Sequence, residues 1–87
     1  MINITQEFYK EILKQILIRI GSGSYYSGTF EGTTDDIKYN FRVSLVIYRD
    51  DFRNVSDLVP IWYEIETFVN GVETQNDFLF SEMQKLI

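Results

Sequence analysis

The feature of this sequence that most constrains the fold is a strict alternation over residues 37–48, IKYNFRVSLVIY. A repeat of two places successive side chains on opposite faces of a β-strand, whereas a helix would need apolar residues three and four positions apart. One apolar face and one mainly polar face are typical of a strand in an antiparallel sheet that covers a core on one side. Residues 37–48 are therefore predicted to form a long, half-buried strand.

A second alternating run, PIWYEIETFV, covers residues 60–69. Its proline stands at the first position, where a strand tolerates the missing N–H. The side chains predicted to face the core are those of Ile61, Tyr63, Ile65 and Val69, and those predicted to face outward belong to Trp62, Glu64, Glu66 and Phe68. This run is the expected partner of residues 37–48.

The two runs are expected to pair as a hairpin in which the numbers of paired residues sum to about 108. This register places Arg42 opposite Glu66 and Val46 opposite Trp62, and it matches every inward residue with another inward residue. Pairs of opposite charge stabilise such a register by roughly 0.2–1 kcal/mol each. Part of the acidity of the chain is therefore expected to be neutralised inside the sheet.

Two further strands are predicted from shorter signals. Residues 25–31 alternate, with Tyr26 and Phe30 toward the core, although a glycine weakens the pattern. Asn70-Gly71 is a strong signal for a two-residue hairpin turn, so the chain is predicted to return as a short strand over residues 72–75. Residues 32–36 are predicted to form a turn, and residues 48–60 a connecting loop.

Helical periodicity precedes these strands. A single apolar stripe is formed by Tyr9, Ile12, Leu13, Ile16, Leu17 and Ile20. Asn3 or Thr5 can cap the start of such a helix, and Gly21 can terminate it. The first element is therefore predicted to be an amphipathic helix that ends near residue 20.

A second helix is predicted for residues 78–87, where Leu79, Met83 and Leu86 form a stripe and Asn76 or Asp77 can act as the cap. The element order is then α-β-β-β-(β)-α. This order predicts an α+β fold with a three- to four-stranded antiparallel sheet and both helices packed on one face. With 87 residues, the chain is expected to be a single small domain, 1–87.

Composition disfavours several kinds of chemistry. The chain has no cysteine and no histidine, which removes thiolate chemistry, the commonest general base and the commonest metal ligand. We therefore expect no enzyme, no cofactor and no metal site. A net charge of -5 opposes direct binding to nucleic acid or to an anionic membrane. Without a signal-like start or an apolar run of ~20 residues, the chain is expected to be cytoplasmic.

Two resemblances to known families are partial. Asp50 and Asp51, followed by Glu64-x-Glu66, resemble the D…(D/E)-x-K motif of metal-dependent nucleases, but Glu66 stands where that motif has lysine. The order of a helix, three strands and a helix is similar to that of double-stranded-RNA-binding domains, in which the second helix begins with basic residues. Here residues 76–78 read NDF. These departures disfavour both activities.

The leading hypothesis is a non-catalytic protein-binding module that uses an aromatic patch at one end of the outward face of the sheet. Tryptophan and tyrosine flanked by arginine are the residue types that dominate interface hot spots. The candidate partner-binding residues are Val46, Tyr48, Arg49, Phe52, Arg53 and Trp62. The alternative for these residues is that the 48–60 loop folds over Trp62 and buries it, or that Trp62 faces inward after a bulge.

Two other functions fit the same chain. The first is a small acidic inhibitor of the phage or mobile-element type, which would occupy the basic site of a nucleic-acid-handling protein. Its candidate residues are Asp35, Asp36, Asp50, Asp51 and Asp57. The second is a self-assembling subunit or homodimer, in which strand edges or outer faces pair between copies.

Overall fold

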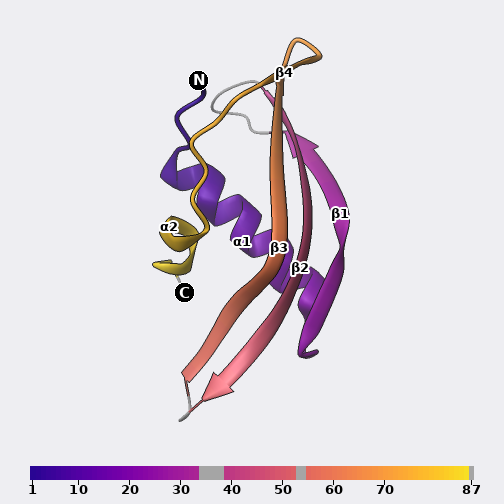
Figure 1. Cartoon of the computed structure of the whole chain (residues 1–87), viewed down its shortest axis with the longest axis vertical. Coiled ribbons are helices and arrows are strands. Elements are labelled where there is room, and N and C mark those ends of the chain that lie inside the picture. Colours follow the sequence, from indigo (N-terminus) through magenta and orange to yellow (C-terminus); the bar gives the residue numbers. More distant parts are fainter. Residues whose placement is uncertain (34–38, 53–54, 87) are drawn as a thin grey trace.

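A four-stranded antiparallel sheet carries both helices on one side (Figure 1). This computed structural model describes residues 1–33, 39–52 and 55–86, with side chains except at 51–52 and 55–56. The elements are α1 (Gln6–Ile20), β1 (Tyr25–Thr33), β2 (Asn40–Phe52), β3 (Val55–Val69), β4 (Val72–Thr74) and α2 (Phe80–Gln84). The strands lie in the order β1-β2-β3-β4, and the predicted α+β fold is confirmed.

The predicted register of the long hairpin is confirmed over its first part. The cross-strand pairs whose residue numbers sum to 108 include Arg42–Glu66, Ser44–Glu64 and Val46–Trp62. The buried residues of β2 are Phe41, Val43, Leu45 and Ile47, all at odd positions. The alternation in the sequence therefore sorts the two faces of β2 as expected.

A β-bulge interrupts the pairing at Ile61. Trp62 and Pro60 pair with consecutive residues of β2, which leaves Ile61 as the extra residue of β3. The alternation predicts that Ile61 faces the core, but its side chain is 65% exposed, so that prediction is wrong. An inserted residue shifts the strand by one position, and Leu58 therefore faces the helices and is buried.

The predicted loop at residues 48–60 is mostly strand. β2 continues to Phe52 and β3 begins at Val55, with Asp50 paired opposite Asp57. This part of the hairpin extends beyond the helices in Figure 1, and Tyr48, Asp50 and Asp57 are exposed there. Charged residues are tolerated on such an exposed ribbon, and for this reason the loop prediction is wrong.

α1 begins and ends where its caps predict. Thr5 Oγ1 accepts a hydrogen bond from the Phe8 N–H at 3.1 Å, and Gly21 has the positive φ of 55° that often follows a helix. The stripe is rotated from the predicted one, because Phe8 is buried and Leu17 is 43% exposed at its margin. The buried residues of α1 are Phe8, Tyr9, Ile12, Leu13, Ile16 and Ile20.

α2 is shorter than predicted. It has five residues, and Leu79 precedes it with an extended backbone and no side-chain cap. The predicted capping side chains bond elsewhere: Asp77 Oδ1 accepts from the Ile4 N–H at 2.6 Å, and Asn76 Oδ1 accepts from the Phe78 N–H at 3.0 Å. The Asp77 bond ties the C-terminal segment to the N-terminus, whereas the Asn76 bond is local. Leu79, predicted to face the core, is exposed.

The two short strands follow their sequence signals. β1 spans nine residues, with Phe30 buried and Tyr26 partly buried against the core, as predicted. The β3–β4 turn has positive φ angles at Asn70 (52°) and Gly71 (80°), as a two-residue hairpin requires. Val69 lies beside this turn and is exposed rather than buried as predicted, because the core does not extend that far.

The core between sheet and helices is rich in aromatic rings. Phe8 meets Phe41 edge-on with ring centroids 5.3 Å apart, and the Tyr39 ring lies 5.7 Å from that of Phe8. Gly32 leaves space for Phe41, because a Cβ there would lie 2.7 Å from the ring. The buried hydroxyl of Tyr39 has no hydrogen-bond partner among the described residues, and burial, with the nearby charge of Asp77, raises its pKa to about 12.

Candidate interaction surface

An aromatic patch lies at one end of the sheet face that the helices leave uncovered. The residues that define this outer patch are Tyr25, Val46, Tyr48, Val59, Ile61 and Trp62. Tyr48 on β2 stands between Tyr25 on β1 and Val59 on β3, and the next outward row begins with Val46 beside Trp62. The exposed fractions of Tyr25, Ile61 and Trp62 are 57%, 65% and 50%. The patch therefore presents apolar side chains that the described part of the chain does not cover.

The position of the patch is set from the other face of the sheet. The guanidinium of Arg49 donates to the backbone oxygens of Gly23 at 2.9 Å and Gly21 at 3.1 Å. Its backbone N–H also donates to Ser24 O at 2.8 Å. These bonds join β2 to the end of α1 and to the start of β1, so they fix Tyr25 beside Tyr48.

The structure brings together three of the residues predicted to bind a partner: Val46, Tyr48 and Trp62. Trp62 points away from the core and is not buried beneath the hairpin. Arg49 lies on the opposite face, because it follows the inward alternation of β2 and pairs with the buried Leu58. Of the remaining predicted residues, Phe52 ends β2 but its side chain lies outside the described ones, as does the whole of Arg53.

Sequence reasoning misses Tyr25, Val59 and Ile61. Tyr25 is on the outward side of its strand in the sequence pattern, but only the β1–β2 register places it beside Tyr48. Val59 and Ile61 reach the patch because the bulge shifts the alternation of β3 by one residue. Pairing the opposite charges of Glu31 and Arg42 would give the register of β1 with β2. That register predicts that Tyr25 lies beside Tyr48.

The aspartates of the acidic-inhibitor hypothesis do not form one surface that the structure describes. Asp35 and Asp36 lie outside the described residues, and the side chain of Asp51 does too. Asp50 and Asp57 face each other across the hairpin, and Asp57 Oδ1 accepts from the Leu58 N–H at 2.9 Å. Within the described ranges, no three carboxylates are close enough to hold a metal ion.

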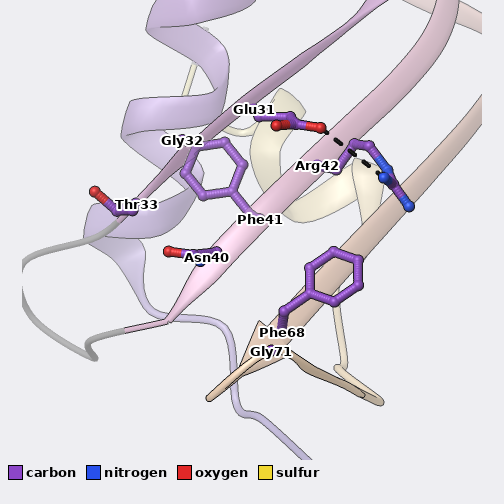
Figure 2. A pocket seen from close by; sticks show the side chains of 8 residues that line it. All are labelled: Glu31, Gly32, Thr33, Asn40, Phe41, Arg42, Phe68 and Gly71. Atoms are coloured by element: carbon purple, nitrogen blue, oxygen red, sulfur yellow. Dashed lines mark ion pairs between the residues drawn. The ribbon is translucent and has the colours of Figure 1, made fainter.

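The opposite end of the uncovered face carries a charged cluster of Glu31, Arg42 and Glu66. Glu31 and Arg42, with Phe68, line a shallow depression of about 420 Å³ (Figure 2). Arg42 Nε and Nη2 donate to the two carboxylate oxygens of Glu66 at 3.0 and 2.9 Å, and Arg42 also lies 3.9 Å from Glu31. These hydrogen bonds hold the pKa of Glu66 below its usual value. The guanidinium lies 5.3 Å from the centre of the Phe68 ring.

This charged cluster offers little to a ligand. An anion that approached Arg42 would have to displace Glu66 from a bidentate ion pair whose carboxylate is mostly buried. Among the described residues here, the two carboxylates of Glu31 and Glu66 face the one guanidinium of Arg42, so the charge of these three side chains also opposes an anion. The outer patch is therefore the stronger candidate for a functional surface.

Compared with known proteins, the chain matches no family model, no curated protein and no solved structure. Neither α1 nor α2, the helices found in the described ranges, has the length and apolar character needed to cross a membrane.

Proposed function

We propose that the protein is a non-catalytic interaction module whose outer patch binds an apolar surface on a protein partner. The observation that carries the proposal is the exposure of Trp62 on a paired strand, with Tyr48 and Tyr25 on neighbouring strands of the same face. Catalysis is left out of the proposal because the sequence has neither histidine nor cysteine.

Aromatic side chains on a sheet suit this role for two physical reasons. Tryptophan and tyrosine bury a large area for few rotatable bonds, so association costs little side-chain entropy. Cross-strand pairing also holds Val46 between Ser27 and Trp62, which limits rearrangement of the patch on binding. Such a surface is already arranged for contact with a partner.

The test compares affinity capture by the wild-type chain, by Trp62→Ser and by Phe68→Ser. Phe68 is the matched control, because it is an aromatic residue on the outward face of the same strand but at the charged end. Each captured protein is then titrated against all three chains. Trp62→Ser should weaken binding by about tenfold or more, the size of a moderate hot spot, while Phe68→Ser binds like the wild type.

Salt separates this proposal from the acidic inhibitor. An apolar contact should keep its affinity at about 0.5 M salt, whereas a contact through aspartates should weaken there because the Debye length falls to a few ångströms. Equal capture by the wild type and Trp62→Ser, or affinity lost mainly to salt, would contradict the proposal.

A further inference from the structure

The sheet has two edges, and the chain protects one of them. β4 pairs only with residues 67–69 of β3, but side chains from the C-terminal segment reach the remainder of that edge. Asn76 Nδ2 donates to Ile65 O at 3.1 Å, and Gln84 Nε2 donates to Leu58 O at 2.8 Å. Pro60 has no N–H to offer, and a bulge follows it. These are devices by which proteins prevent strands from adding to an edge.

At the other edge, formed by β1, the described residues provide none of these devices. In an antiparallel pair, residues alternate between those that bond the partner strand and those whose N–H and C=O point away. The Arg49 N–H donates to Ser24 O, so the even-numbered residues of β1 bond β2. The residues that direct their backbone groups outward are then Tyr25, Ser27, Thr29, Glu31 and Thr33. Among the backbone hydrogen bonds of the described residues, none reaches these groups.

The composition of β1 makes this edge complementary to itself. β1 contains no proline and no lysine, and its only charge is Glu31. A second β1 placed antiparallel with Thr29 opposite Thr29 pairs all nine residues and directs the outward groups of both strands at each other. Ser27 then faces Glu31. The two glutamates are about 13 Å apart along the strands, beyond the Debye length of about 8 Å at physiological salt.

We propose that two copies of the chain associate through β1, antiparallel, about a two-fold axis at Thr29. The axis is perpendicular to the sheet, so both helical layers lie on one side of a continuous sheet and both outer patches on the other. A second copy fits this edge without a clash of like charges, whereas centring the axis on Glu31 would oppose two carboxylates. This inference goes beyond the proposed function and does not rest on it.

The test is sedimentation velocity on the wild-type chain, Thr29→Lys, Thr29→Glu and an equal mixture of the two variants. At the two-fold axis, residue 29 meets its own copy, so each variant opposes like charges and should sediment as a monomer. The mixture should recover the dimer, because lysine then faces glutamate. The wild type should shift from monomer to dimer as its concentration is raised to about 1 mM, and it should associate more tightly as salt screens its net negative charge.

Ser44→Lys is the matched control. Ser44 Oγ lies 3.0 Å from Thr29 Oγ1, so this variant loses the same hydrogen bond and adds the same charge on an interior strand. It should remain a dimer. A wild type that is monomeric throughout, a Thr29→Lys variant that sediments like Ser44→Lys, or a mixture that stays monomeric would each overturn the proposal. Trp62→Ser should leave the dimer intact, which keeps this result separate from the test of the outer patch.

Discussion

The two ends of the uncovered sheet face differ in how their side chains are satisfied. At the charged end, Arg42 is paired with Glu66 and lies over the Phe68 ring, so its polar groups find partners within the chain. At the other end, Tyr48 and Trp62 are 37% and 50% exposed on the face that the helices leave uncovered. β2 and β3 contribute side chains to both ends, so the contrast arises from side chains and not from backbone.

The difference separates stability from recognition. Charged side chains that bond one another stabilise the strand register and have few free hydrogen-bonding groups to offer a partner. Exposed aromatic surface contributes little to folding, but its burial against a partner is favourable. Substitutions at the charged end should therefore change the free energy of unfolding, and those at the outer patch should change binding.

The largest effect is expected for Arg42→Met. This change leaves Glu66, which is mostly buried, without its bidentate partner, and it removes the cation from beside Phe68. Loss of such a pair should lower Tm by about 10 °C, as measured by thermal denaturation followed by circular dichroism. Arg42→Lys keeps the charge but not the two parallel hydrogen bonds, so its Tm should lie between those of the wild type and Arg42→Met. An unchanged Tm would show that the pairing has no part in holding the register.

A polar group without a partner should have the opposite effect when it is removed. Tyr39 lies beneath the charged end, and Tyr39→Phe deletes a buried hydroxyl that is unpaired within the described residues. The variant should be more stable by about 1 kcal/mol in urea denaturation at neutral pH. A loss of stability would mean that the hydroxyl is satisfied in solution.

The stabilities of the wild type and Tyr39→Phe should also depend differently on pH. The unfolded chain releases the Tyr39 proton near pH 10, whereas the folded chain keeps it up to a pKa of about 12. The unfolded state therefore binds fewer protons in this interval, and stability is lost as pH rises from 10 toward 12. Tyr39→Phe should show a shallower loss over this range.

The smallest effect on folding is expected for Trp62→Thr. Trp62 is 50% exposed, and threonine is β-branched and also favours a strand, so the free energy of unfolding should change by about 0.5 kcal/mol or less. Urea denaturation measures it, with Ile65→Thr on the partly buried face of the same strand as the comparison. A large loss for Trp62→Thr would make the outer patch a part of the fold, and the contrast between the two ends would fail.

Local patterns are enough to predict most of the architecture. The alternation over residues 37–48 and 60–69 predicts the hairpin and the pairing of Arg42 with Glu66, because register follows from which side chains must be buried. Asn70-Gly71 predicts the tight turn, because few residues accept two positive φ angles in succession. These signals depend only on residues close together in the sequence.

The failures have several causes. The bulge at Ile61 inserts one residue into an otherwise regular strand, and nothing in the local alternation marks it. The continuation of the hairpin past Tyr48 carries charges that are typical of a loop. Asn76 and Asp77 are good capping residues, but long-range bonds occupy them first. Only in this last case does the outcome depend on residues far away in the chain.

Arg49 shows what such a distant contact implies for experiments on the outer patch. Its side chain lies on the face opposite Trp62 and would not contact a partner bound there. It bonds the backbone of residues 21–23, which precede Tyr25 and hold it beside Tyr48. An alanine scan would therefore score Arg49 as a recognition residue although it sits one sheet thickness beneath the contact. Thermal melting of Arg49→Ala, run alongside the binding assay, distinguishes a loss of structural support for Tyr25 from the loss of a direct contact with the partner.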